Sequence, residues 1–254
     1  SQYVVCPEQR KVGNSNSRLI RPIGVFAHEF GHALGLPDLY DTTPDGESDS
    51  EGIGHWCLMG AGSWLGNDGD TPSHMSAWCK YKLGWVDPIV LSSENYENFI
   101  DNTFPSGKLE LENIEENDNQ IYKIYADSYQ WNEYFLLENR QRDILVEYDE
   151  YPYGSGSADN GTGLMIYHVD ENQFWGMTQY FGFGTNNDNY LHKLIDIEAA
   201  DGNQDLDNSS NRGDSGDPYP GSSGNTVFNN TTNPNNYNYG GLSSSVTFTN
   251  ITEE

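Results

Sequence analysis

Basic residues are scarce in this sequence. The 254 residues include 12 Lys and Arg against 39 Asp and Glu, so the formal net charge is −27. Such a chain repels polyanions, which argues against nucleic acid or an anionic membrane surface as a partner. The acidity is compatible with a soluble extracellular protein or with the binding of cations.

Long apolar runs are also missing. No segment approaches the roughly 20 residues needed to cross a membrane, so no membrane span is predicted. The first ten residues lack the basic and apolar regions of a signal peptide, so we expect any such peptide to lie upstream or to have been removed. Aromatic residues, in contrast, are plentiful, with 17 Tyr, 10 Phe and 6 Trp. Their large buried area argues for a folded chain.

Cysteine is rare, and an odd number of these residues leaves at least one unpaired within the chain. The three are Cys6, Cys57 and Cys79. One disulfide with a free thiol and three buried thiols both remain open. No C-x-x-C pair is present, so we do not expect a zinc site built from cysteines.

The pattern of the chain changes near residue 88. Before it, helices are predicted at Pro22–Leu34 and at Ser73–Leu83, the second with Thr71 or Ser73 as its N-cap. After it, alternating apolar residues predict strands between loops rich in Gly, Ser and Asn. The predicted strands are Lys108–Ile114, Gln120–Ala126, Tyr134–Glu138, Leu164–Val169, Leu194–Ile197 and Val246–Thr249. The chain is therefore expected to have an α+β fold.

The segment from His28 to Asp38, HEFGHALGLPD, carries the strongest chemical signal. Residues four apart in a helix share a face, so His28 and His32 can direct two imidazoles at one point. Glu29 can then approach a metal-bound water without binding the metal, as in the H-E-x-x-H pattern of zinc proteases. Gly35 permits a sharp turn after the helix that can return Asp38 to the histidines, and a carboxylate is an acceptable zinc ligand.

A bare H-E-x-x-H sequence can also arise by chance in a helix whose histidines merely face solvent. Here the predicted helix, the glycine at its exit and the metal-binding residue beyond it favour zinc. We therefore predict a catalytic zinc ion held by His28, His32 and Asp38, with a fourth position open to water. Glu29 is the predicted general base, which would take a proton from that metal-activated water as it attacks a peptide bond.

Two stretches resemble the metzincin family of zinc peptidases. His28–Asp38 is similar to its extended zinc signature, with Asp in place of the commoner His as third ligand. Trp56–Trp64 is similar to its Met-turn, with Met59 as the methionine. More narrowly, the chain resembles the immune inhibitor A family of secreted bacterial metallopeptidases. This similarity is carried by His28–Asp41, Met59–Trp64, Ser76–Trp78, Glu133–Gln141, Gly163–Asp170 and Gly216–Gly221.

The resemblance implies a secreted bacterial zinc endopeptidase that acts on protein or peptide substrates outside the cell or at its surface. It implies that residues 1–88 are the C-terminal part of a metzincin-like catalytic domain, followed by a β-rich, mostly antiparallel portion at residues 89–254. Met59 would form the floor beneath the metal by packing, without ligating it. The chain departs from several metzincins at Gly60 and Ala61, where a Tyr that stabilises the oxyanion commonly follows the Met-turn.

A second cluster of oxygen-bearing side chains lies between residues 201 and 207, at alternate positions as in a calcium-binding loop. Leu206 and Arg212 stand where an EF-hand has Gly and Glu, so the loop is not an EF-hand. An irregular calcium site and a solvated acidic loop both remain open. Because the acidic chain repels itself, we predict at least one calcium ion. The candidate ligands are Asp201, Asn203, Asp205 and Asp207.

These observations support two main classes of function. The first is a zinc-dependent endopeptidase. The alternative is a cell-surface binding or adhesion module, in which calcium-stabilised β loops act and the zinc site is vestigial. The intact Glu29 favours the enzyme, because a vestigial site has no need of a base beside its ligands. A metallohydrolase for a substrate other than protein is a weaker third hypothesis.

Overall fold

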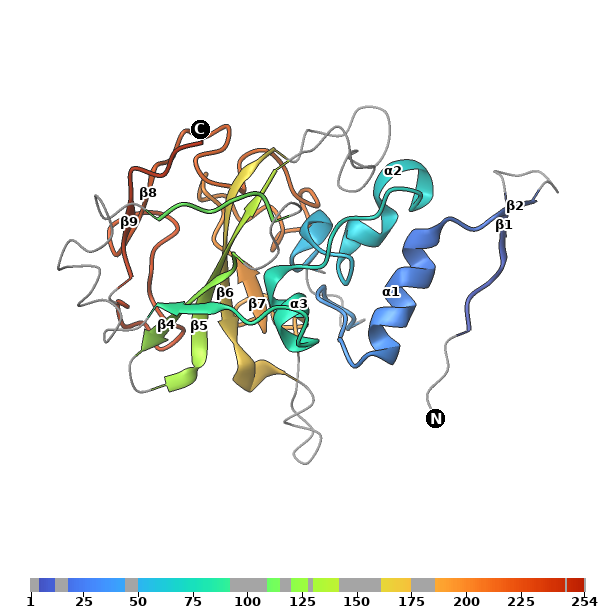
Figure 1. Cartoon of the computed structure of the whole chain (residues 1–254), viewed down its shortest axis with the longest axis horizontal. Helices are drawn as coiled ribbons and strands as arrows, with labels where there is room; N and C mark the ends of the chain where they lie inside the picture. Colours follow the sequence, from blue (N-terminus) through green and yellow to red (C-terminus); the bar gives the residue numbers. More distant parts are fainter. Residues whose placement is uncertain are drawn as a thin grey trace.

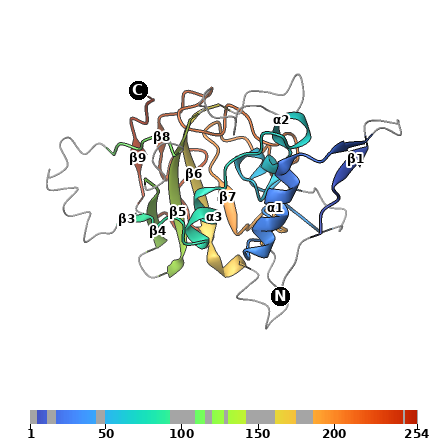
Figure 2. The same cartoon turned by 45° about the vertical axis from the view of Figure 1, so that its right-hand side comes forward.

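The chain has an α+β architecture built around one five-stranded sheet. The computed structural model describes residues 5–11, 18–43, 50–91, 109–114, 120–127, 130–141, 161–174, 186–244 and 246–253. Figure 1 shows the sheet between helix α1 and the pair of short strands β8 and β9, and Figure 2 shows the five strands of the sheet from β3 to β7. No helix within these ranges has the length and apolarity needed to cross a membrane.

The helices are short and lie mostly in the first third of the chain. They are α1 (Ile23–Ala33), α2 (Leu65–Asp68) and α3 (Ala77–Lys82), with 3₁₀ helices η1 (Gly54–Trp56), η2 (Ala61–Trp64) and η4 (Glu171–Gln173). The strands of the central sheet are β3 (Ile89–Leu91), β4 (Tyr122–Asp127), β5 (Gln130–Arg140), β6 (Gly163–Asp170) and β7 (Ile195–Ile197). Two separate ribbons pair β1 (Gln9–Lys11) with β2 (Arg18–Ile20), and β8 (Val227–Phe228) with β9 (Phe248–Thr249).

The central sheet is mostly antiparallel, as predicted. Its strand order is β3-β4-β5-β6-β7, and β3 with β4 is the one parallel pair in it. The longest pairing joins β5 and β6, from Glu133 opposite Asp170 to Arg140 opposite Gly163. Because side chains alternate along a strand, each of these two strands contributes to both faces of the sheet.

The alternation produces two apolar layers. On one face, Tyr134 and Leu136 of β5 pack with Trp78 of α3 and with Met59. On the other face, the neighbouring residues of β5 join side chains from the last third of the chain. That second layer contains Phe135, Leu137, Ile166, Tyr219, Phe228 and Val246. The first layer runs across residue 88, and the predicted division of the chain there stays a prediction.

Most predicted elements are present with shifted ends. The helix predicted at Pro22–Leu34 is confirmed as α1, and five of the six predicted strands overlap β4, β5, β6, β7 and β9. The strand predicted at Lys108–Ile114 is wrong for the part that is described, where Asn113 makes only an isolated bridge to Asn139. Lys108 itself lies outside the described residues.

Helix α3 begins later than the sequence pattern predicts. Its N-cap is Ser76, whose hydroxyl accepts a hydrogen bond from the backbone N–H of Cys79 at 3.4 Å. The residues before it are held by the Met59 segment instead: the N–H of Ser73 donates to the Gly62 carbonyl, and the N–H of Leu58 donates to the His74 carbonyl. Tertiary pairing of this backbone therefore delays the first helical turn.

The cysteines are three free thiols, of which two are buried. Cys57 and Cys79 have their Sγ atoms 3.7 Å apart, and Cys6 is only partly covered. The Cys57 sulfur also accepts backbone N–H bonds from Met59 and Ser76, both at 3.3 Å. This contact links the Met59 segment to the start of α3, where both lie behind the candidate site.

Candidate metal centre

Helix α1 presents the two histidines predicted as ligands. Its N-cap is Pro22, whose fixed φ of −60° suits a helix start, and it ends at Leu34. Gly35 follows with φ +103°, a conformation that costs glycine little. The predicted sharp exit from the helix is therefore confirmed, and the chain turns back beneath α1.

The returning segment is fixed by backbone hydrogen bonds and by buried leucines. The N–H of Leu36 donates to the Gly31 carbonyl at 3.1 Å, and the N–H of Leu39 donates to the Met59 carbonyl at 2.9 Å. Both leucine side chains are buried in the core layer next to the sheet. Asp38 lies between them in sequence and faces the helix.

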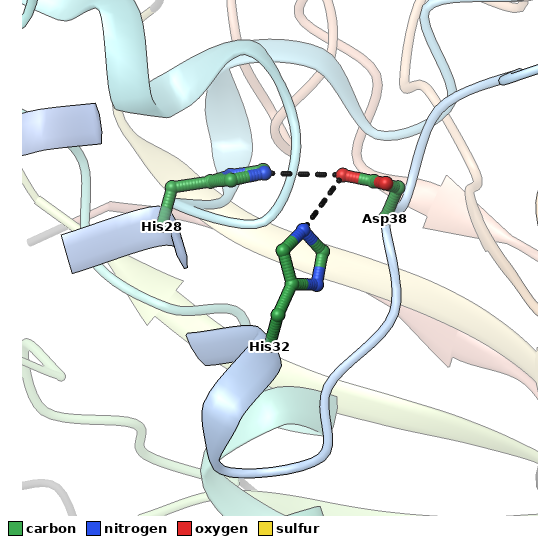
Figure 3. A group of neighbouring side chains, drawn as sticks. All are labelled: His28, His32 and Asp38. Carbon is green, nitrogen blue, oxygen red and sulfur yellow. Dashed lines mark hydrogen bonds and ion pairs between the residues drawn. The ribbon is translucent and has the colours of Figure 1, made fainter. Parts of the chain in front are cut away.

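The three predicted ligands converge. The Nε2 atom of His28 lies 3.0 Å from Oδ1 of Asp38, and the Nε2 atom of His32 lies 3.3 Å from the same oxygen. Figure 3 shows both imidazoles pointing from α1 toward the Asp38 carboxylate on the loop that follows the helix. Among the described residues, these three form the one group of His, Cys, Asp or Glu close enough to share a metal ion, with their ligand atoms within 4.8 Å of one another.

The far side of each imidazole is fixed by a backbone carbonyl. Nδ1 of His28 lies 2.8 Å from the Leu58 carbonyl oxygen, and Nδ1 of His32 lies 2.9 Å from that of Leu36. A carbonyl only accepts, so each Nδ1 carries the proton that it donates. In neutral histidine this leaves the Nε2 lone pair directed toward Asp38, the arrangement that second-shell hydrogen bonds impose on metal-binding histidines.

The electrostatics of the group favour a cation at its centre. Burial alone would lower the pKa of His28, but hydrogen bonds to Asp38 and Leu58 outweigh it and raise that pKa. The hydrogen bond to Asp38 raises the pKa of His32 to about 8 despite burial. Burial opposes ionisation of Asp38, yet the hydrogen bonds from both histidines hold its pKa well below the usual range. An ionised carboxylate thus faces both Nε2 atoms.

The donor set and its spacing fit zinc. Two imidazole nitrogens and one carboxylate oxygen are a common protein ligand set for catalytic zinc. With ligand bonds of about 2.0–2.1 Å, neighbouring ligand atoms of a tetrahedral site lie about 3.3 Å apart. The two distances to Asp38 Oδ1, 3.0 and 3.3 Å, are close to that spacing. Little movement of these side chains would be needed to hold the ion.

Met59 packs against the histidine-bearing helix; that it forms the floor of the site is what the family resemblance implies. Its side chain is fully buried, and a Cβ added at Gly31 of α1 would overlap its sulfur. Gly31 is therefore required by the close approach of Met59 to the helix. Sequence reasoning did not single out Gly31, although a glycine inside a helix signals such an approach.

Glu29 lies beside the histidines at a cavity of about 240 Å³. This cavity is also lined by His28 and by Gly60 and Ala61, which follow Met59. Glu29 is half-buried. The predicted base therefore lines the same cavity as one of the predicted ligands, His28.

Two residues of this site were missed by sequence reasoning. Tyr40 stacks on His28 with ring centroids 6.5 Å apart, and its hydroxyl is hydrogen-bonded to Asp38. Burial and the neighbouring Asp38 charge raise the pKa of Tyr40, so the hydroxyl stays protonated. Arg212 lines the cavity from the last third of the chain. The position of Tyr40 two residues after a predicted ligand was a usable signal, whereas no local pattern marks Arg212.

Among the described residues, Asp201, Asp205 and Asp207 do not form a group of acidic side chains close enough to share one ion. Asp207 is paired with the buried Lys193, and Asp205 accepts a hydrogen bond from Asn211. Asp201 accepts hydrogen bonds from the backbone and the side-chain amide of Asn203. An amide N–H that faces a carboxylate takes the place that a cation would occupy, so this geometry gives no support to the predicted calcium site.

Comparison with known proteins finds a family that is similar to the segment containing the candidate site. Residues 19–86 match the immune inhibitor A peptidase M6 catalytic domain. The predicted family resemblance is thereby confirmed for this part of the chain. The matched segment contains His28, Glu29, His32, Asp38 and Met59, and it ends before the central sheet.

Two curated relatives align with parts of the chain. The pre-pro-metalloprotease PrtV of Vibrio cholerae serotype O1 is 48% identical over 89 residues, which cover 31% of this chain and 10% of that protein. Immune inhibitor A of Bacillus thuringiensis subsp. alesti is 49% identical over 55 residues, which cover 21% of this chain and 8% of that protein. The aligned part thus spans about a tenth or less of each relative's length.

Proposed function

We propose that this chain carries the catalytic centre of a secreted zinc-dependent endopeptidase with a metzincin-like site. The observation that carries the proposal is the convergence of His28 Nε2 and His32 Nε2 on Asp38 Oδ1, beside a glutamate at a cavity. The peptidase family match and the metalloprotease named among the relatives support it. His28, His32 and Asp38 would hold the ion.

Each residue of the site has a different role in the proposed hydrolysis. Zinc bound by this ligand set would polarise the substrate carbonyl and lower the pKa of a water molecule. Glu29 would accept the proton of the attacking water and then donate it to the leaving amine. The Leu58 and Leu36 carbonyls orient the histidines, and Tyr40 holds Asp38 by its hydroxyl. Gly60 and Ala61 are small residues in the wall of the cavity that Glu29 also lines.

Glu29→Gln is the test of this proposal. The variant should bind one zinc ion per chain with wild-type affinity, because Glu29 is not among the converging ligands, and should lose at least 100-fold in kcat. Zinc content measured by elemental analysis and hydrolysis of a fluorogenic peptide measure the two effects. Turnover equal to that of the wild type would exclude Glu29 as the base.

The same experiment separates the alternative of a binding module with a vestigial zinc site. In that case the wild-type protein would bind zinc and hydrolyse no peptide under any condition. His32→Ala serves as the matched control, since it removes a ligand from the same helix and should lose zinc as well as activity. Loss of activity in both variants, with zinc lost only from His32→Ala, is the pattern expected for the enzyme.

A further inference from the structure

The cavity beside Glu29 is lined by a positively charged side chain, Arg212, from a distant part of the chain. Its walls come from α1, from the segment after Met59 and from the loop that contains Arg212. Among the described residues that line it, Arg212 is the only lysine or arginine. At about 240 Å³ the cavity has room for one side chain, since this volume equals that of about eight water molecules in the liquid.

The backbone holds Arg212 firmly in this wall. Its carbonyl oxygen accepts a hydrogen bond of 2.7 Å from the N–H of His55 in η1. The side-chain amide of the preceding Asn211 donates to Asp205 and to Asp214, at 3.2 and 2.7 Å. The loop therefore fixes where the arginine side chain begins.

The guanidinium is anchored by one edge. Its Nε atom lies 3.0 Å from Oε2 of Glu51, and 45% of the arginine side chain remains exposed. The terminal amino groups of a guanidinium form a planar pair of donors that matches the two oxygens of a carboxylate. The contact described for Arg212 joins Nε to Glu51, and the terminal pair of donors has the geometry to take a further carboxylate.

We propose that Arg212 binds a carboxylate of the substrate and makes this cavity selective for it; the inference rests on the proposed peptidase function. The carboxylate is either an acidic side chain or the C-terminal carboxylate of a peptide. Two acidic residues, Glu29 and Glu51, also line the cavity. Glu51 is already paired with Arg212, and Glu29 has its proposed role in the reaction.

The test uses the zinc-loaded full chain and fluorogenic peptides that share one neutral sequence. Each peptide carries Glu, Gln or Lys at one position next to the scissile bond. The substituted position is varied on either side of the scissile bond. At one such position, kcat/KM should be about five- to tenfold higher for the Glu peptide than for the Gln peptide. Peptides with free and with amidated C-termini form the second arm, and a preference there alone would assign Arg212 to the chain end. No preference in either arm, or a preference for Lys, would overturn the proposal.

Two substitutions assign the preference to Arg212. Arg212→Gln should bring the Glu-to-Gln ratio to about one, and Arg212→Lys should keep part of it, because the charge remains while the fork is lost. Arg10→Gln is the matched control: Arg10 is paired with Asp68 and does not line the cavity, so the wild-type ratio should remain. A wild-type Glu-to-Gln ratio in Arg212→Gln would overturn the assignment. If that variant does not fold, a wild-type ratio in Arg212→Lys would overturn it instead.

A binding measurement keeps this inference separate from the peptidase proposal. The same Glu and Gln peptides, labelled with a fluorophore, are titrated into the Glu29→Gln variant and their anisotropy is followed. Tighter binding of the Glu peptide, lost in the double variant with Arg212→Gln, supports the carboxylate site even if no peptide is hydrolysed. Hydrolysis of neutral peptides without any charge preference would leave the peptidase proposal standing and overturn this one.

Discussion

Asp217 connects η1 to a loop in the last third of the chain. It is buried, and its Oδ2 accepts hydrogen bonds from the indole N–H of Trp56 at 2.7 Å and from the backbone N–H of Asp214 at 3.0 Å. Burial raises the pKa of Asp217 to about 7, although these two hydrogen bonds oppose the rise. The charges of Asp214 and Asp201 raise it further. The Asp217 side chain therefore links two segments by hydrogen bonds, while its burial makes the charged form unfavourable.

Asp217→Asn should stabilise the protein above neutral pH. The folded-state pKa lies above the unfolded value of about 3.8, so the contribution to stability is present below pH 3.8 and is lost as the pH rises through 7. The Asn oxygen can accept the same hydrogen bonds without a buried charge. We expect the free energy of unfolding at pH 8 to rise by about 2 kcal/mol.

Urea unfolding at pH 5 and pH 8, at one fixed concentration of free zinc, measures this effect. The gain should be smaller at pH 5, where the Asp217 carboxyl of the folded protein is mostly protonated. A variant that is less stable than the wild type at pH 8 would contradict this prediction. It would mean that the hydrogen bond from Trp56 to a charged carboxylate stabilises the fold by more than the burial of that charge destabilises it.

At the scale of the elements, β5, β6 and β7 are joined by a buried imidazole as well as by their backbone. His168 of β6 lies between Glu133 of β5 at 2.9 Å and Glu198, which follows β7, at 3.1 Å. Its ring stacks on Tyr239, with the centroids 4.5 Å apart. Sequence analysis predicts only a strand here. One carboxylate comes from β5 and the other from the residue after β7, so their convergence depends on the register of the sheet.

The sheet should lose stability at alkaline pH through His168. Burial favours the neutral ring, but the two carboxylates overcome this and raise the pKa of His168 to about 9. Because the folded pKa exceeds the unfolded value of about 6.5, the stabilisation is complete below pH 6.5 and is lost as the pH rises through 9. Wild-type unfolding free energy should fall by about 2 kcal/mol between pH 7 and pH 9.5.

His168→Gln provides the comparison for that measurement. The variant should be less stable at pH 7, because Glu133 and Glu198 lose their cation, and its stability should change less between pH 7 and pH 9.5. Chemical unfolding followed by circular dichroism at several pH values records both profiles. Parallel profiles for the wild type and the variant would show that other groups cause the alkaline loss.

At the scale of the whole molecule, the dominant feature is a net charge of −27. Ion pairs such as those of Lys193 with Asp196 and Asp207 neutralise only part of it, since the chain has 12 lysines and arginines for 39 acidic residues. Unpaired like charges on a compact molecule repel one another and destabilise the folded state. Salt screens this repulsion over about 8 Å at an ionic strength of 0.15 M.

Thermal stability should therefore increase with salt at low ionic strength. We expect Tm to rise by several degrees, on the order of 5 °C, between 10 and 150 mM sodium chloride. Differential scanning calorimetry of the zinc-loaded protein measures the change, with sucrose of equal osmolality as the control for exclusion effects. A Tm that is constant or falls would mean that attractive ion pairs outweigh the repulsion.

The sequence by itself determined the candidate metal centre and much of the secondary structure. His28, His32 and Asp38 lie within eleven residues, and helical periodicity followed by a glycine turn is enough to bring them together. The core strands of the sheet were predictable because apolar and polar residues alternate with the pleat. Such signals are local, so no distant part of the chain is needed to interpret them.

The tertiary structure alone decided which distant groups meet. Strand β3 was not predicted, because three residues pairing in parallel with β4 leave no pattern of their own. The alternate acidic residues after Asp201 suggested calcium, yet Lys193 and Asn211 take up the carboxylates. Arg212 reaches the cavity beside Glu29 only because its loop docks on η1. These contacts depend on the relative positions of whole elements, which the packing of the core fixes and no short-range pattern encodes.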